Sequence, residues 1–301
     1  MIVKEQPTAM ELFTTMHGSI VPQIVTKILS IAVISVVVLI IDGLFVPLPH
    51  ISISAMGIFG IAHSMFLGFR NTAAYDLWWE ARKLSGGMIA DTRTLGRDAR
   101  IFLHTEETRR SFLTMIPAFA HFHRGYLRNS DASGSVVRFA GEERTHILAT
   151  YANPADATLR DMADQLADLK NDGSISGFGQ LRMSQSLSSL ALAQAGCERI
   201  ANTPLPYVYS LLVRRTTYLY CWLLPFALIE STDLFTPLFA AIVAYVFFGL
   251  QAVTNELEAP FSNVQNGLPL DAMCRTIEIS VAEALGDDTP DAMQPQGFVI
   301  T

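Results

Sequence analysis

The chain has 301 residues, of which 50% are hydrophobic and only 16% are charged, and its mean hydropathy is positive at +0.32. Soluble domains carry about 25% charged residues, so the deficit indicates a chain that lies partly in a bilayer. The formal net charge of −7 argues against nucleic-acid binding, which needs a basic surface. Three cysteines without a CxxC spacing predict neither a disulfide framework nor a zinc site.

Charged residues are distributed unevenly along the chain, and this divides it into five predicted parts. Two long stretches around residues 24–69 and 216–255 are almost free of charge, whereas the segment between them has ordinary soluble composition. We therefore predict a cytosolic amino-terminal segment, a first membrane part, a helical cytosolic domain, a second membrane part and a cytosolic carboxy-terminal part. Their ranges are residues 1–23, 24–69, 70–215, 216–255 and 256–301.

The first membrane part has room for two crossings, since a helix needs about 20 mostly apolar residues to span the hydrocarbon core. The first predicted span runs from Ile24 to Val46, with Asp42 near its far end, and residues 47–50 reverse the chain. The second span, residues 51–69, is rich in glycine, alanine and serine. Small residues allow close helix contact in lipid, so we expect this span inside a helix bundle.

Two membrane crossings are also predicted for the second membrane part. The third span, residues 216–229, contains Pro225 and is short, so we expect it to include an earlier turn at residues 211–213. Residues 231–233 form the next turn, and the fourth span is residues 234–255.

Lysine and arginine gather on the cytoplasmic side of membrane proteins, and here they lie on one side of the four spans. Six basic residues flank that side: Lys27, Arg70, Arg82, Lys83, Arg214 and Arg215. The turns at residues 47–52 and 231–235 contain none. Both termini and the long middle segment are therefore predicted to be cytoplasmic.

The middle and carboxy-terminal segments are predicted to be helical. Apolar residues recur at helical spacing across residues 102–119 and 159–169, and strand-like alternation is nearly absent. Loops are expected at residues 129–134 and 171–179, where glycine, asparagine and serine gather. A last helix is expected over residues 271–285, followed by a polar tail. The predicted fold class is therefore all-α.

Four stretches resemble, in the same order, the motifs of the bestrophin family in its bacterial branch. They are His17-Gly18-Ser19, residues 66–86, residues 195–209 and residues 255–272 (NELEAPFSNVQNGLPLDA). The resemblance covers most of residues 17–280. It implies a homopentamer around a central pore, with four transmembrane helices per subunit and a helical cytosolic vestibule, in the inner (plasma) membrane of a bacterium.

The family resemblance also implies ion conduction: of chloride and other anions in animal members, and of monovalent cations in a bacterial one. The bacterial resemblance and the acidic balance slightly favour cations such as sodium here. An anion channel and a secondary transporter are the alternatives, although nearly charge-free spans are unusual for a transporter. No catalytic residue is recognised in the spans, so no enzyme and no cofactor is predicted. The expected partners are copies of the chain, membrane lipid and permeant monovalent ions.

Three residues of the second span correspond to the hydrophobic neck rings of the family: Ile61, Met65 and Phe69. Their spacing of four places them on one helix face, with a rise of about 6 Å between rings. A narrow apolar ring resists wetting and so blocks ions until it widens. The alternative is that the three side chains form the core of the helix bundle.

The family has a second constriction at the cytosolic exit, made by one apolar side chain near the start of a helix. The corresponding region is residues 172–178, where we place the ring on Ile175, with Phe178 as the alternative. The competing interpretation is that both residues anchor a loop on the vestibule wall.

The chain departs from the animal bestrophins where these carry a run of acidic residues that binds calcium. The matching residues 262–267 contain no carboxylate, whereas calcium prefers several charged oxygen ligands. The channel is therefore predicted not to be activated by calcium. Glu256 and Glu258, which precede this stretch, are interpreted as a solvated helix end.

Histidines do not predict a metal site. His121 and His123 point about 200° apart on a helix, so they are not expected to share one ion. His63 lies away from the predicted pore face, and a buried hydrogen bond between helices is favoured over a pH gate.

Overall fold

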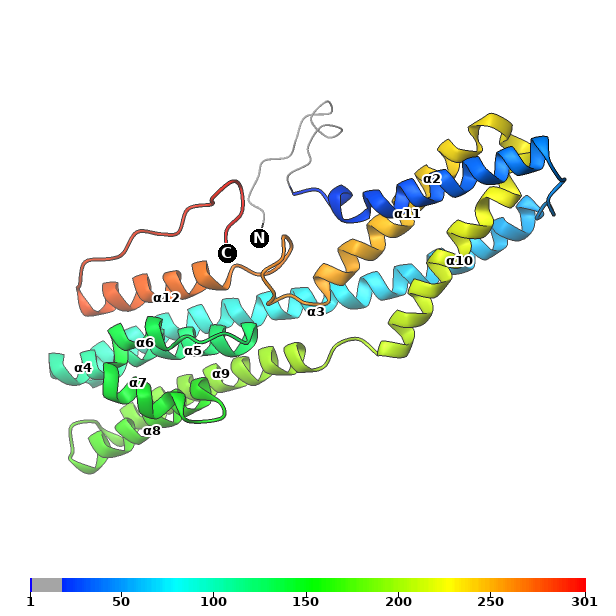
Figure 1. Ribbon diagram of the computed structural model, residues 1–301. Helices are drawn as coiled ribbons and strands as arrows, with labels where there is room; N and C mark the ends of the chain where they lie inside the picture. The colour runs from blue at the N-terminus through cyan, green and yellow to red at the C-terminus, as the bar shows by residue number, and fades with distance from the viewer. Residues whose placement is uncertain (2–17) are drawn as a thin grey trace. The chain divides into compact units, whose positions relative to one another are not determined.

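The structure is a computed structural model that describes residue 1 and residues 18–301 (Figure 1). Among the described residues the regular elements are helices, apart from one isolated bridge between Gln296 and Val299. The predicted all-helical class is confirmed for this part of the chain. His17, in the amino-terminal motif, lies outside the described residues.

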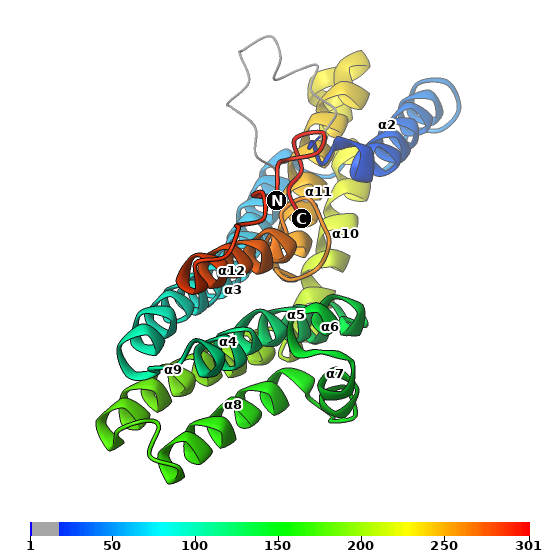
Figure 2. The same ribbon diagram turned by 90° about the vertical axis from the view of Figure 1, so that its left-hand side faces the viewer.

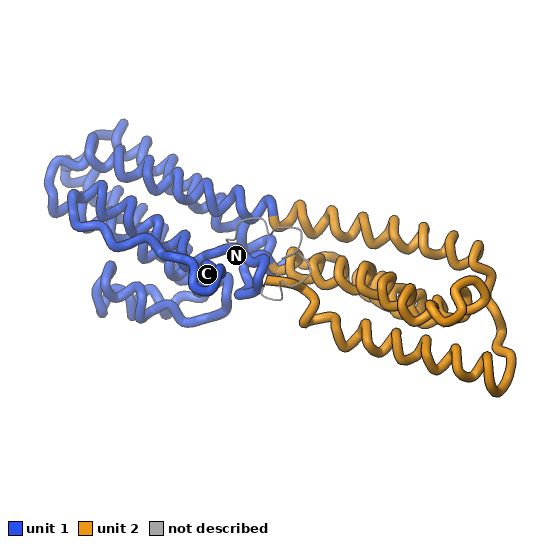
Figure 3. The backbone as a smooth tube through the Cα atoms, turned by 90° about the horizontal axis from the view of Figure 1, so that it is seen from above, with its two compact units in different colours: residues 1–4, 79–203, 260–301 blue, residues 5–78, 204–259 orange. Residues whose placement is uncertain are grey.

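The described chain forms two compact units, coloured separately in Figure 3. Unit 1 contains residues 79–203 and 260–301, and unit 2 contains residues 18–78 and 204–259. Helix α3 (Ile53–Phe102) contributes residues to both. The predicted boundaries at residues 69/70 and 215/216 concern a different division, that between membrane and cytosolic parts. This division stays a prediction.

Unit 2 is built from four helical segments and one short connection. They are α2 (Val21–Leu44), the first half of α3, α10 (Tyr207–Thr232), η1 (Asp233–Phe235) and α11 (Thr236–Leu257). Helix α10 begins at Tyr207, directly after Pro206 and before the turn at residues 211–213 that the sequence predicts as an addition to this span. Pro225 lies inside the helix without ending it. Helix α3 likewise continues beyond Phe69 without a break.

Three stretches of the described chain are long and apolar enough to cross a membrane: Val21–Leu44, Ile53–Phe102 and Tyr207–Leu257. The third contains both α10 and α11, joined by η1. The helices of this apolar unit lie side by side in Figure 1, where α2 packs on α11 and both contact α10.

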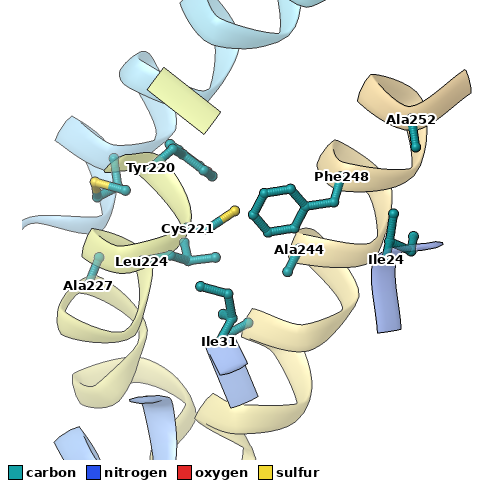
Figure 4. Packing of buried hydrophobic residues seen from close by; sticks show 11 residues of the cluster. Ile24, Ile31, Tyr220, Cys221, Leu224, Ala227, Ala244, Phe248 and Ala252 are labelled. Carbon is teal, nitrogen blue, oxygen red and sulfur yellow. The ribbon is translucent and has the colours of Figure 1, made fainter. Parts of the chain in front are cut away.

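The core of unit 2 joins large side chains of one helix to small ones of the next (Figure 4). Ile24 and Ile31, two turns apart on α2, face Ala244 and Phe248 of α11, and Cys221 of α10 lies beside the phenyl ring. Alanine at the contact allows close helix approach, which is what stabilises helix pairs in lipid.

Unit 1 is a helical bundle with α5 at its centre. Its helices are the second half of α3, α4 (Glu106–Leu113), α5 (Met115–Arg128), α6 (Ser133–Ala140), α7 (Glu142–Ala149), α8 (Pro154–Asn171), α9 (Gly177–Asn202) and α12 (Leu270–Leu285). Helix α5 contacts α4, α6, α8, α9 and α12, and part of this packing is visible in Figure 2. Its residues 115–123 are all buried.

The two histidines of α5 have different surroundings. His121 Nε2 lies 2.6 Å from Glu278 Oε1, and Arg138 also donates to that carboxylate. Burial raises the pKa of Glu278, but the hydrogen bond from His121 and the charges of Arg138 and Arg275 outweigh it, so the net pKa is lowered. His123 is buried and neither of its ring nitrogens has a partner.

Burial lowers the pKa of His123 from 6.5 to about 4, which makes the stability of unit 1 sensitive to acid. A histidine whose folded pKa is depressed is neutral in the native state, so its contribution is complete above pH 6.5 and is lost as the pH falls towards 4. The full loss is about 3 kcal/mol. We expect His123→Phe, which keeps the ring against Phe119, to reduce the loss of thermal stability between these pH values.

The exposed His146 offers a matched control, since His146→Gln should leave the acid dependence unchanged. Thermal unfolding of both variants across this pH range measures the effect. If His123→Phe kept the full acid sensitivity of the parent protein, His123 would not be its cause.

Candidate pore surface

The first half of α3 has one buried face and one exposed face. Met56, His63 and Leu67 point into unit 2 and are almost completely buried. The predicted neck residues lie on the other face: Ile61, Met65 and Phe69 are 74%, 52% and 60% exposed. Within a single chain these three side chains therefore lie outside the core, and their role in a pore stays a prediction.

The exposed face of α3 is wider than the three neck residues. Ile58 and Phe66 are also exposed on this helix, and a Cβ added to Gly57 or Gly68 would meet no atom within 4 Å. These two glycines are therefore uncovered within one chain, whereas Gly60 is buried against Tyr220, as the sequence predicts for small residues inside a bundle. A continuous apolar surface of this kind is typical of contact with lipid or with another copy of the chain.

His63 lies on the opposite face of α3 and makes the buried hydrogen bond that the sequence favours. Its Nε2 lies 3.1 Å from Thr217 Oγ1 of α10. The imidazole ring also packs beside the rings of Tyr220 and Phe247. This histidine therefore connects α3 to α10 and α11, on the side of α3 away from the neck residues.

Arg70, the residue directly after Phe69, is completely buried although it is charged. Its Nη2 lies 2.7 Å from Glu258 Oε1 and donates to Asn255 Oδ1 at 2.9 Å. A buried charge is tolerated only when it is paired, so Glu258 is the residue that allows Arg70 to remain in the interior.

Further hydrogen bonds link the same end of α11 to the rest of unit 2. Thr254 donates to Asn71 Oδ1 at 3.2 Å, and Arg214 donates to Asn255 Oδ1 at 2.9 Å. Glu256, which is buried, accepts from Gln23 Nε2 at 2.7 Å. The interpretation of Glu256 and Glu258 as a solvated helix end is therefore wrong, because both carboxylates are paired inside the protein.

The sequence contained a signal for this cluster. Arg70 is the first charged residue after the long uncharged stretch that begins at Gly43, and Glu256 and Glu258 follow a second such stretch. Opposite charges at the same end of two membrane-spanning segments can pair. From the sequence alone, Arg70 indicates only the cytoplasmic side of the second span.

The two aperture candidates have opposite surroundings in unit 1. Ile175, in the turn between α8 and α9, is only 2% exposed, and its N–H donates to Leu169 O at 3.0 Å. A Cβ on Gly179 would lie 2.9 Å from its Cγ1, so Ile175 is packed against the start of α9. Phe178 is 85% exposed. In a single chain Phe178 is therefore the exposed one of the two, and the position of an aperture on Ile175 or Phe178 stays a prediction.

The segment after α11 forms a tight turn. Leu268 N donates to Pro260 O at 2.7 Å, and a Cβ on Gly267 would lie 2.2 Å from Ser262 O, so only glycine fits there. Within residues 18–301, no group of three or more His, Cys, Asp or Glu side chains is arranged to hold a metal ion.

Long apolar helices, an uncovered apolar face on one of them and a polar helical unit are typical of a helical integral membrane protein. A family model described as "Bacterial/Fungal Bestrophin protein" matches residues 1–283. The chain belongs to the bacterial and fungal bestrophin family, and the resemblance of its four motifs is confirmed.

Relatives and solved structures agree with this membership. A voltage-dependent anion channel-forming protein of Mesorhizobium japonicum is 42% identical over 299 residues, which are 99% of this chain and 96% of the relative. The voltage-dependent anion channel-forming protein YneE of Salmonella typhi is 34% identical over 284 residues, 94% and 93% of the two chains. The crystal structure of a bacterial bestrophin homologue from Klebsiella pneumoniae matches with a TM-score of 0.83 at 32% identity, over 88% of this chain and 99% of that one.

Proposed function

We propose that five copies of this chain form an ion channel whose neck is lined by Ile61, Met65 and Phe69. The observation that carries the proposal is the exposure of these three apolar side chains on one face of α3, while the opposite face is buried in the subunit. Five-fold symmetry would turn each of them into a closed apolar ring, which hinders wetting and thereby gates ions. Phe178 is the residue that we propose for the cytosolic aperture.

In this proposal each subunit crosses the inner membrane of a bacterium four times, with α2, α3, α10 and α11. Both termini lie in the cytoplasm. Support comes from the basic residues next to the spans. The turns at residues 47–52 and 231–235 contain no lysine or arginine, and their one acidic residue is Asp233.

Small monovalent cations such as sodium are proposed as the permeant ions. The support is the resemblance to the bacterial branch of the family and the acidic balance of the chain, with a net charge of −7, since excess negative charge attracts cations. Anions are the second candidate, because the relatives from Mesorhizobium japonicum and Salmonella typhi carry the name of anion channel-forming proteins. The apolar neck itself does not choose the sign of an ion.

Electrical recording from the purified protein in a planar bilayer tests the proposal. Five chains of 33.1 kDa should give a particle of about 165 kDa after correction for detergent. We expect unitary currents, with a reversal potential in a sodium chloride gradient close to the sodium potential. A reversal potential near that of chloride would show that the permeant ions are anions rather than cations. A monomeric particle, or transport without unitary currents, would contradict the channel proposal.

Conduction should persist in a strong calcium chelator. The segment after α11 that carries acidic ligands in animal bestrophins has no carboxylate between residues 262 and 267, and Glu258 is already paired with Arg70. Calcium therefore lacks the charged oxygen ligands that it prefers. Currents that disappear on chelation and return with micromolar calcium would contradict this prediction.

A further inference from the structure

Unit 1 contains an open groove between α3 and α12 that is lined by arginine. The groove has a volume of about 360 Å³. Its lining residues are Arg93, Gly96, Arg97, Arg100, Ser280, Glu283 and Ala284. All of them belong to unit 1, and the groove is separate from the proposed neck.

The groove follows from the spacing of the arginines and from one glycine. Arg93, Arg97 and Arg100 are exposed and lie at positions i, i+4 and i+7, so their side chains share one face of α3 over about 10 Å. Gly96 lies between them at the contact with α12, where an added Cβ would lie 3.0 Å from Ala284 Cβ. Glycine thus brings α12 close to the row of arginines.

The three guanidinium groups are not matched by carboxylates of the described chain. Arg93 Nε donates only to Ser280 Oγ, at a long 3.4 Å, and Arg97 Nη2 donates to Thr94 Oγ1 at 3.1 Å. Ion pairs within 4.0 Å occur elsewhere in unit 1, as between Arg110 and Asp287 at 2.7 Å, but none of the described pairs involves these three arginines.

The charge of the groove is therefore strongly positive. Three arginines and one carboxylate, that of Glu283, line it, which leaves a net excess of two positive charges (3 − 1 = 2). This contrasts with the acidic balance of the whole chain, whose net charge is −7. A local basic groove on an acidic protein concentrates anions at that position.

We propose that this groove binds a diphosphate or triphosphate group, either free or as part of a nucleotide. Guanidinium groups form paired hydrogen bonds with phosphate oxygens, and several in a row suit an extended polyanion better than a single-atom anion such as chloride. The hydroxyl of Ser280 adds a neutral donor beside Arg93. Glu283 repels further phosphate and accepts hydrogen bonds from hydroxyl groups, as acidic residues do from the ribose of bound nucleotides.

Titration calorimetry of the full-length protein in detergent tests the proposal. Sodium pyrophosphate is titrated at constant ionic strength, and adenosine diphosphate, adenosine and sodium sulfate are titrated in parallel. We expect saturable binding of one pyrophosphate per chain. Arg97→Gln and the double variant Arg97→Gln/Arg100→Gln should weaken it at least tenfold, because each removes charge-assisted hydrogen bonds.

Arg160→Gln is the matched control, since Arg160 is an exposed helical arginine of the same unit that is already paired with Asp156 at 2.7 Å. Its affinity for pyrophosphate should equal that of the parent protein. Tighter binding of adenosine diphosphate than of pyrophosphate, with none of adenosine, would identify a nucleotide, and equal binding would identify a free diphosphate.

Several results would overturn the proposal. These are the absence of saturable pyrophosphate binding, equal weakening by Arg160→Gln, and adenosine binding as tightly as the diphosphate. A change of particle size by light scattering in the Arg97→Gln variant would also overturn it, because the arginines would then contact a neighbouring subunit. None of these results depends on whether the protein conducts ions, so the groove and the channel proposal fail separately.

Discussion

Replacing Ile61, Met65 and Phe69 together by alanine should raise the open probability or the current severalfold. Removing bulky side chains from each ring widens the constriction and lowers the free energy of wetting it. Folding should survive, because the three side chains are exposed on α3 and are not packed in the core of unit 2. Single-channel recording measures the current, and thermal unfolding measures the stability.

Helix α2 offers a matched control for this triple variant. Leu29, Val33 and Val37 are also exposed and have the same four-residue spacing, but they lie on a helix that the proposal places against lipid. Their replacement by alanine should leave the current unchanged. A neck variant that is stable but electrically unchanged would defeat the pore assignment.

A loss of stability in the neck variant would be equally informative. If the three residues form a packed core in the assembled protein, their truncation leaves cavities that cost about 2–5 kcal/mol each. Aggregation or a large fall in melting temperature would then favour the core interpretation over the pore.

Replacing Glu258 by glutamine should destabilise the protein by about 3–5 kcal/mol, because it leaves the charge of Arg70 buried with the neutral Asn255 as its partner and no carboxylate. Arg70 is completely buried, and Glu258 Oε1 lies 2.7 Å from its Nη2. Glutamine has nearly the same shape, so the loss reports the charge rather than the packing. Thermal unfolding of the purified variant measures the effect.

The ion pair also lies next to the proposed neck, since Arg70 follows Phe69 on α3. We therefore expect single-channel currents of Glu258→Gln to differ from those of the parent protein under conditions where the variant remains folded. This outcome would connect the end of α11 to the conformation of the neck.

Two further variants isolate the charge of Arg70. The double variant Arg70→Met/Glu258→Gln should recover much of the stability, because an apolar side chain in place of a buried ion needs no partner. Glu106→Gln is the control for an exposed pair, since Glu106 lies 3.6 Å from Arg110 at the surface, and it should leave the stability almost unchanged. Equal stability of Glu258→Gln and the parent protein would show that the pair does not stabilise Arg70.

The sequence by itself determined the helical class, the approximate positions of the apolar helices and the family. These properties depend on local signals, namely hydropathy, helical periodicity and turn residues, which act over one helix at a time. Prediction was less accurate where a helix continues past charged residues, as at Arg214 and Arg215 in α10 and from Arg70 onwards in α3. Hydropathy reports where apolar character ends, and a hydrogen-bonded helix does not have to end there.

Only the tertiary structure decided which side chains meet and which remain exposed. Arg70 and Glu258 are 188 positions apart (258 − 70), and their pairing depends on the packing of α3 against α11, which no local pattern contains. Ile175 and Phe178 are both apolar and three residues apart, yet the close approach at Gly179 buries the first and leaves the second exposed. The arginine groove likewise needs α12 beside α3, because burial and pairing are properties of surfaces brought together by the fold.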